Sequence, residues 1–480
     1  MAIKAGDRYQ RNLFPPSIEE YVGIDDPVRA YDAIIDALPI DEIGLNDRKS
    51  PIGNSNYDPK TMLKILVYAY SYGWQSSRKI ERALHHNLSF IWIAGGLKPD
   101  YRTISRFRKN NSETLKRALK QCARVCIKLD LIEGNILFLD GSKFRGNSSI
   151  NKTYTQKGYR KLLDKVEKKI NTLLAEIDAI DDQEQKIGSA KLKEELQNQE
   201  SLRDKVKSVL EEMKAQGVDK INNTDNDAVN FKGRQGSHAG YNVQVVTDEK
   251  NGLIVHADVV AESNDKNQFS SQIDQANKNL KDQCKAACGD SGYHNVNNLS
   301  ESVEKGMTVI VPSQKQASDN PTEDCFSKEN FTYDEDSDAY ICPEGHIVRF
   351  SHYSKKKDHD VYRMEVPSIC RECPHWGVCT KGKRGRTINR LKNEACQKKL
   401  ASIYESDYGQ NIYKKRKMKV ELQFGHIKRN LRGGSFLVRS LKSVQGEMAI
   451  YASCFNIARM ITLLGGVKRM VRLLSEGAVT

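Results

Sequence analysis

The segment Ile136-Leu137-Phe138-Leu139-Asp140-Gly141-Ser142 decides the fold of this chain. Its apolar run predicts a buried strand over 135–140, and the Asp-Gly-Ser sequence predicts a turn that ends the strand. A carboxylate at the end of a buried strand lies at the edge of a sheet, where ligands collect in α/β proteins. The segment therefore predicts a functional acid, Asp140, at the end of the first strand.

Further strands are predicted downstream of this segment. Residues 241–247 and 253–259 flank a polar turn that contains Gly, which is typical of a β-hairpin. We also expect a helix over 265–280 and strands over 286–290 and 307–312. The order of strand, hairpin, helix, strand, helix and strand predicts a mixed α/β sheet with flanking helices.

Two other acids complement Asp140. Asp290 ends the segment Lys285-Ala286-Ala287-Cys288-Gly289, and Glu421 lies seven residues before Lys428. Single acids at strand ends often only form turns, so each acid alone is weak evidence. Three carboxylates brought together would repel one another unless cations lay between them, and oxygen ligands suit Mg²⁺ or Mn²⁺. Paired divalent ions held by carboxylates catalyse phosphoryl transfer on nucleic acids.

The positive charge of the chain is concentrated around Glu421. The formal net charge is +14, and residues 381–432 contain 16 Lys and Arg against four acids. Lys and Arg displace counterions from phosphates, so this segment favours nucleic-acid binding. A solvated basic face that keeps the protein in solution is the alternative interpretation.

Helical geometry gathers several of these side chains. At about 100° per residue, Tyr413, Lys417, Glu421, Phe424 and Lys428 share one face, and Arg416 falls elsewhere. Lysines on either side of an acid would suit a metal-binding carboxylate next to a phosphate. A surface helix with charge pairs explains only part of this pattern.

The parts of the chain outside this core have their own patterns. Short helices separated by Gly and Pro are expected over residues 1–130, a pattern that suits either a helix-turn-helix-like DNA-binding domain or plain helical packing. Residues 159–214 carry apolar residues at helical spacing, interrupted at Gly188-Ser189, and predict an antiparallel helical hairpin of coiled-coil type.

Four cysteines of the polar segment 318–385 are candidate metal ligands: Cys342, Cys370, Cys373 and Cys379. The Cys370-x2-Cys373 spacing lets two thiolates face one tetrahedral ion, and Cys342 and Cys379 could complete a Zn²⁺ site. His346, His352, His359 and His375 are substitute ligands. Four reduced thiols without a metal are the alternative, and we weigh the two interpretations equally.

These motifs together resemble those of a DDE transposase of a bacterial insertion sequence. Asp140 in Phe-Leu-Asp-Gly-Ser and Asp290 in Cys-Gly-Asp-Ser-Gly-Tyr are similar to the first two catalytic aspartates. Tyr413, Arg416, Glu421 and Lys428 resemble the Y-R-E-K signature, in which Glu421 is the third acid. Four residues separate Arg416 from Glu421 where the broad signature has three, so Lys417 is expected to share that role with Arg416. The Cys-rich insertion is similar to one carried by a subgroup.

The resemblance implies a ribonuclease-H-like core that binds Mg²⁺ or Mn²⁺ through Asp140, Asp290 and Glu421. It implies strand cleavage at element ends, followed by strand transfer to target DNA. The implied partners are double-stranded DNA and a second copy of the chain in the synaptic complex. The side chains expected to contact DNA are Tyr413, Arg416, Lys417, Lys428, Arg429 and Arg432.

Other interpretations of the whole chain remain. One is a non-catalytic DNA-binding protein derived from a transposase, and a more distant one is a zinc and coiled-coil scaffold. The polar start of the chain predicts no signal peptide, and the late apolar stretch, 448–464, reads as a buried helix and not a membrane span. We therefore expect a cytoplasmic, nucleoid-associated protein.

The expected organisation follows from these patterns. It consists of a helical DNA-binding domain (1–130), the first strand of the catalytic core (131–150), a helical-hairpin insertion (151–225), the continued core (226–317), a Cys-rich insertion (318–385) and the C-terminal helices of the core (386–480).

Overall fold

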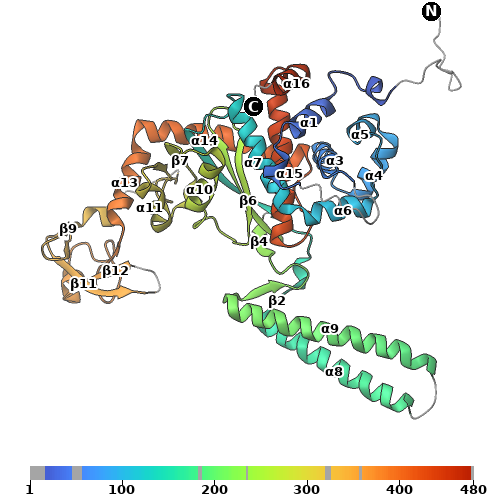
Figure 1. The fold of residues 1–480 in the computed structure, drawn as a ribbon. Helices are drawn as coiled ribbons and strands as arrows, with labels where there is room; N and C mark the ends of the chain where they lie inside the picture. Colours follow the sequence, from blue (N-terminus) through green and yellow to red (C-terminus); the bar gives the residue numbers. More distant parts are fainter. Residues whose placement is uncertain are drawn as a thin grey trace, which may run out of the picture. The chain divides into compact units, whose positions relative to one another are not determined.

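The structure is a computed structural model that describes residues 17–45, 57–181, 186–233, 236–318, 326–355 and 359–476 (Figure 1). The chain divides into two compact units. The first unit comprises Met1–Asp265, Gln272–Gln283 and Lys417–Thr480, and the second comprises Lys266–Ser271 and Cys284–Arg416.

The amino-terminal part of the first unit is helical, as the sequence predicts. Its elements are η1 (Ile18–Tyr21), α1 (Pro27–Asp36), α2 (Ile40–Ile43), α3 (Pro59–Ser71), α4 (Ser77–His86), α5 (Leu88–Ile93), α6 (Tyr101–Asn110) and α7 (Ser112–Lys128). Asp58 caps α3 by accepting hydrogen bonds from the backbone of Lys60 and Thr61. Gly73, with a φ of +65°, follows the end of that helix.

The strands of the first unit are antiparallel. Four of them pair in one sheet: β1 (Ile136–Arg145), β4 (Val229–Gly233), β5 (Gly236–Asp248) and β6 (Ile254–Val260). The predicted hairpin is confirmed as β5 and β6, and β5 also pairs with β1 and with β4.

The predicted turn after Asp140 is wrong, because β1 continues to Arg145 and Asp140 lies inside the strand, opposite Val245. The long strand β5 supplies pairing partners as far as Gly240, where a Cβ atom would overlap with the carbonyl oxygen of Phe144.

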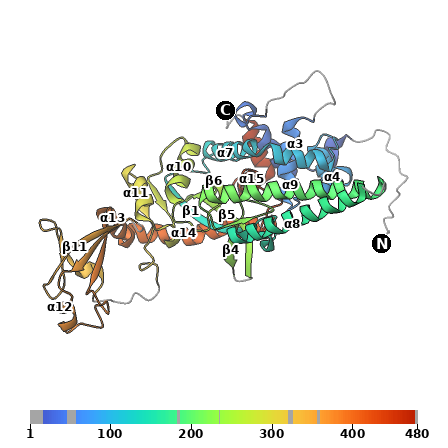
Figure 2. The same ribbon diagram turned by 90° about the horizontal axis from the view of Figure 1, so that it is seen from below.

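The helical hairpin is present and forms its own packed layer. It contains η2 (Ile150–Lys152), β2 (Thr153–Thr155), α8 (Gln156–Asp181), α9 (Lys186–Gln216) and β3 (Lys220–Asn222). The two helices lie side by side in both views (Figures 1 and 2). Tyr159 near the start of α8 packs with Met213 near the end of α9, so the helices are antiparallel. The break predicted at Gly188-Ser189 is wrong, because both residues lie within α9. Regular coiled-coil packing stays a prediction.

The first unit is completed by carboxyl-terminal helices. Helix α14 (Asp407–Gly425) ends in this unit and continues into a π-helical turn, η5 (His426–Asn430), which precedes α15 (Leu441–Leu463) and α16 (Val467–Ser475). Helix α15 is buried along most of its length. In the described ranges, no single helix is long and apolar enough to span a membrane, and only α15 and α16 taken as a pair bent by 102° match in length and composition.

The second unit combines a parallel strand pair with a small antiparallel sheet. The parallel pair is β7 (Ala286–Cys288) and β8 (Thr308–Ile310), with η3 (Ser291–Tyr293), α11 (Val296–Glu304) and α13 (Glu394–Glu405), while α10 (Phe269–Leu280) crosses the boundary of the units. The predicted mixed α/β class with flanking helices is therefore confirmed.

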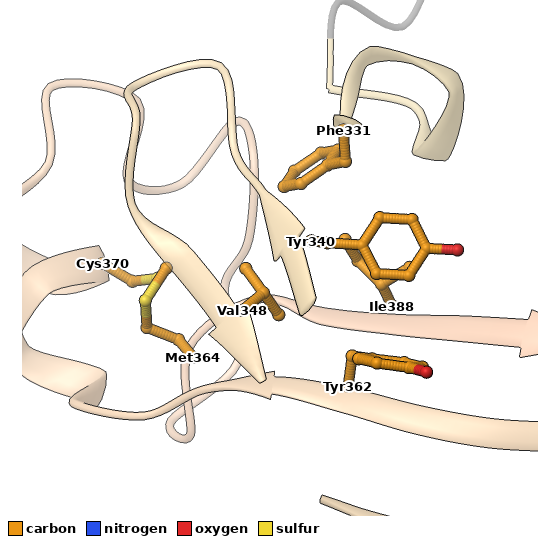
Figure 3. Close-up of a cluster of buried hydrophobic side chains, with 7 residues drawn as sticks. All are labelled: Phe331, Tyr340, Val348, Tyr362, Met364, Cys370 and Ile388. Carbon is orange, nitrogen blue, oxygen red and sulfur yellow. The ribbon is translucent and has the colours of Figure 1, made fainter. Parts of the chain in front are cut away.

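The small sheet has the strand order β13-β12-β11-β10-β9. Its elements are η4 (Lys328–Asn330), β9 (Thr332–Asp334), β10 (Ala339–Ile341), β11 (Ile347–Ser354), β12 (His359–Met364), α12 (Pro367–Glu372) and β13 (Thr387–Leu391). Seven buried side chains form its core: Phe331, Tyr340, Val348, Tyr362, Met364, Cys370 and Ile388. Figure 3 shows Cys370 beside Met364 at one end of this core and the two tyrosines at the other.

Candidate active site

Asp140 projects from the face of β1 that also carries Ser142 and Phe144, because side chains alternate along a strand. Asp140 and Ser142 are half-buried and Phe144 is buried. The Phe144 ring packs against Phe424 of α14, with 6.1 Å between the ring centroids. Helix α14 therefore covers the face of β1 from which Asp140 projects.

Lys428 lies against the same face of β1 as Asp140, Ser142 and Phe144. Its Nζ donates a hydrogen bond of 2.6 Å to Ser142 Oγ and lies 4.8 Å from the centroid of the Phe144 ring. Burial lowers the pKa of Lys428, and the negative charge of Asp140 opposes that shift. The π-helical turn that contains Lys428 changes the angular spacing after Glu421, and such turns are frequent at functional sites.

A further acid, Asp265, is held on the opposite face of the same strand pair. Its Oδ1 accepts hydrogen bonds of 2.7 Å from Asn242 Nδ2 and from Gln244 Nε2, and Lys143 Nζ lies 3.5 Å away. Asn242 pairs with Lys143 across β1 and β5, so these side chains share one face. Asp265 therefore closes a local network with its neighbours.

Asp290 follows β7 in the second unit and accepts a hydrogen bond from the backbone N–H of Gly292 at 2.9 Å. Its other oxygen lies 3.7 Å from Nη2 of Arg416, which is buried. Burial raises the pKa of Tyr413, Arg416 opposes that shift and the charge of Asp290 adds to it. Tyr413 and Arg416, one turn apart on α14, thus both act on the surroundings of Asp290. Helical geometry placed Arg416 away from the face shared by Tyr413 and Glu421, so it gave no indication of the contact with Asp290.

The remaining predicted side chains lie at the surface. Glu421, Lys417, Arg429 and Arg432 are exposed. Asp140, Lys428 and Glu421 belong to the first unit, whereas Asp290, Tyr413 and Arg416 belong to the second. The assembly of all three acids stays a prediction, as does DNA contact by the basic residues.

Four cysteines of the second unit, Cys342, Cys370, Cys373 and Cys379, line one small cavity of about 30 Å³ together with His346 and His375. His352 and His359, also weighed as substitutes, are not among its lining residues. The Nε2 atom of His375 lies 3.0 Å from a carboxylate oxygen of Glu344.

Two of these sulfurs accept backbone hydrogen bonds. The N–H of His346 donates to Cys342 Sγ at 3.3 Å, and the N–H of Arg386 donates to Cys370 Sγ at 3.4 Å. Burial raises the pKa of Cys379, Arg386 opposes that shift, and the three other thiols add to it.

Coordination geometry is a stricter condition than proximity. Among the residues that the structure describes, no group of three or more His, Cys, Asp or Glu side chains is arranged to hold a metal ion. The four thiols surround one cavity, but their present positions do not form a complete coordination shell.

Two segments of the chain match families of known proteins. Residues 16–110 match the family described as "Transposase domain (DUF772)", and residues 341–461 match the family described as "Transposase DDE domain". The second match includes Glu421, Lys428 and the four cysteines, whereas Asp140 and Asp290 lie outside both matches. No curated protein and no solved structure matches the chain significantly. The chain therefore carries a transposase DDE domain and an amino-terminal transposase domain.

Proposed function

We propose that this chain is a DNA transposase that cleaves strands at element ends and transfers them to target DNA. Asp140, Asp290 and Glu421 are its catalytic acids and the ligands of Mg²⁺ or Mn²⁺. The observation that carries this proposal is that Lys428, within the segment matched to a transposase DDE domain, lies against the face of β1 that bears Asp140.

The chemistry of the side chains fits this role. Asp140 and Asp290 are half-buried and Glu421 is exposed, so their oxygens remain within reach of a substrate. Divalent ions held there would lower the pKa of the attacking water or hydroxyl and neutralise charge on the leaving oxygen. Lys428 would orient a phosphate next to Asp140, and Arg416 would do the same next to Asp290. Lys417, Arg429 and Arg432 would hold the DNA backbone outside the site.

The substitutions Asp290→Asn and Glu421→Gln test the proposal, because each removes one negative charge and keeps the shape of the side chain. The substrate is a duplex that carries the element's own ends, with Mg²⁺ or Mn²⁺, and nicks are measured on denaturing gels. We expect both variants to lose cleavage and to keep DNA binding in a mobility-shift assay. A variant that still cleaves would show that the substituted acid is not catalytic. A wild-type chain that binds DNA without cleaving it would support the non-catalytic alternative.

The proposal includes a synaptic dimer, since two element ends must be brought together before strand transfer. Light scattering of the chain with end-containing DNA should give the mass of two chains and two duplexes. A complex that contains one chain in the presence of both ends would contradict it. The assignment to the Y-R-E-K group rests on Tyr413, Arg416, Glu421 and Lys428 and belongs to the same proposal.

We also propose that Cys342, Cys370, Cys373 and Cys379 bind a structural Zn²⁺ ion. Support comes from the shared cavity and from the backbone N–H groups directed at two of the sulfurs. A small shift of these side chains would complete a tetrahedral set with sulfurs about 2.3 Å from the ion. The ion would stabilise a small sheet whose main hydrophobic cluster, among the described residues, consists of seven buried side chains.

Metal analysis of the purified chain tests this second proposal. Emission spectroscopy should find about one zinc per chain, with loss of the metal in Cys342→Ser. The matched control is Cys396→Ser, because Cys396 is a half-buried free thiol that does not line the cavity. Absence of zinc after purification from zinc-supplemented cells, or unchanged zinc in Cys342→Ser, would favour four reduced thiols.

A further inference from the structure

The first unit contains a large polar groove of about 870 Å³. One side is formed by the start of α4 and by α6, and the other by residues 224–227 and 437–443. The groove therefore joins the amino-terminal helices to the loops next to β1 and α15. Its lining is mainly hydroxyl, amide and charged groups.

Three exposed cations line the groove: Arg78, Lys109 and Arg439. The guanidinium of Arg78 lies 5.1 Å from the centroid of the Tyr101 ring, so its position is restricted before any ligand binds. Arg439 Nε donates a hydrogen bond of 2.8 Å to the carbonyl oxygen of Asn147.

The two acids in the lining are engaged by the protein itself. Asp225 accepts hydrogen bonds from the hydroxyl of Tyr241 at 2.7 Å and from the backbone N–H of Ser440 at 3.2 Å. Asp227 accepts one from the backbone N–H of Leu441 at 2.7 Å, at the start of α15. These carboxylates balance the amino-terminal end of α15, and the cations remain available to an anion.

Two further groups in the groove favour an anion. Ser76 and Ser77 line the groove at the start of α4. In the described structure, the Ser76 side chain makes no capping hydrogen bond to this helix, so the backbone N–H groups of its first turn can face an anion. Arg108 also lines the groove and is only 3% exposed. It donates to the hydroxyl of Tyr70 and to the carbonyl oxygen of Gln75, while its Nε atom has no hydrogen-bond partner in the described part of the chain.

The positive surface continues along α4. A second hollow of about 590 Å³ shares Arg78 with the groove and is lined by Trp74, Lys79, Arg82 and His86. A ligand that fills both hollows must be extended, which argues against a single small molecule. Arg, Lys, Ser and Asn side chains and a helix amino terminus are the groups that usually contact DNA phosphates.

We propose that this groove, continued along α4, binds the phosphate backbone of duplex DNA and so links the amino-terminal helices to the core on one DNA segment. The inference rests on the proposed function and adds the surface by which the DNA is held. It predicts that binding strength depends on Arg78 and Lys109 for any duplex sequence, because phosphate contacts carry no base information.

The double variant Arg78→Glu/Lys109→Glu tests the groove. Its matched control, Lys161→Glu/Lys165→Glu, makes the same change in net charge at exposed residues of α8. Binding of a fluorescent 30-base-pair duplex of arbitrary sequence is measured by anisotropy over a range of salt concentrations. We expect the groove variant to bind about tenfold more weakly or worse, with a salt slope lower by roughly two, since each lost phosphate contact lowers the slope by about 0.9. The control should bind like the wild-type chain.

A second variant, Ser105→Glu, adds a negative charge to the groove without removing a contact within the protein, and it should also weaken binding several-fold. Circular dichroism confirms that each variant is folded. Equal losses in the groove and control variants, or an unchanged salt slope, would overturn the proposal, as would saturable binding of ATP that competes with the duplex. Cleavage is measured separately. A wild-type chain that binds DNA through the groove and never cleaves it would contradict the proposed transposase activity and still support DNA binding by the groove.

Discussion

The two faces of the β1–β5 strand pair carry acids in opposite circumstances. On one face Asp140 lies beside Lys428, whose Nζ donates a hydrogen bond to the Ser142 hydroxyl and lies near the rings of Phe144 and Phe424. On the other face Asp265 receives hydrogen bonds from Asn242 and Gln244 and an ion pair from Lys143. One strand pair thus presents one carboxylate that is built into the fold and another that faces the helix of the transposase DDE domain.

The difference shows how a catalytic acid can be distinguished from a structural one. An acid whose oxygen already accepts two amide hydrogen bonds and an ion pair has less capacity left for a ligand. An acid on a strand face that a helix covers, near a lysine of lowered pKa, lies where a phosphate could be held. The following predictions test this division, beginning with the largest expected effect.

Asp140→Asn should reduce DNA cleavage by at least about a thousandfold, the scale on which removal of a principal catalytic group acts. The free energy of unfolding should change by less than about 0.5 kcal/mol, because the substitution keeps the side-chain shape. Single-turnover cleavage and chemical denaturation measure the two quantities. Near-wild-type cleavage by this variant would contradict the assignment of Asp140 as a catalytic acid.

Asp265→Asn should show the reverse behaviour. Loss of the charge weakens the hydrogen bonds from Asn242 and Gln244, and the free energy of unfolding should fall by about 1–3 kcal/mol. Cleavage by the folded variant should stay within a few-fold of wild type. If this variant is stable and inactive, Asp265 belongs to the catalytic set and the division between the faces is wrong.

Lys428→Met should reduce cleavage by about ten- to a hundredfold, as expected for the loss of one charge-assisted contact worth about 1.5–3 kcal/mol. Methionine keeps an apolar stem against Phe144 and Phe424, so packing changes little. The matched control is Lys143→Met on the opposite face, which should affect stability and leave cleavage almost unchanged. Equal losses of cleavage in both variants would contradict a specific role for Lys428.

Ser142→Ala should have the smallest effect. It removes the hydroxyl that accepts from Lys428 and should lower cleavage by about two- to tenfold, the scale of one hydrogen bond worth about 0.5–1.5 kcal/mol. Steady-state cleavage at several DNA concentrations should show the loss in kcat and little change in KM, because Ser142 positions the lysine and does not hold the DNA. A change confined to KM would place Ser142 in DNA binding instead.

Much of the fold is predictable because it depends on local pattern. The helix capped by Asp58, the β-hairpin of β5 and β6 and the pair of long helices follow from apolar periodicity and turn residues. The extension of β1 past Asp140 is not predictable in this way. Its residues Gly141, Ser142 and Lys143 favour a turn locally, and the long partner strand β5 overrides that preference.

The candidate site, like the fold, is predictable from the sequence only in part. The sequence identifies Asp140, Asp290 and Glu421 as notable acids, and it indicates Lys428 through its spacing from Glu421. The contact of Lys428 with Ser142 and that of Arg416 with Asp290 join residues 286 and 126 positions apart, so no local pattern could reveal them. The groove likewise joins Arg78 to Arg439, which are distant in the chain.

The sequence by itself determined the class of the fold, the basic segment and the residue types from which a metal-dependent site and a thiol cluster can be built, because these depend on composition and short-range periodicity. The tertiary structure alone decided which acid faces α14, which acid accepts hydrogen bonds from amide side chains and which cations share a groove. Those properties depend on the side of a strand or helix that packing covers, and packing is settled by residues far apart in the chain.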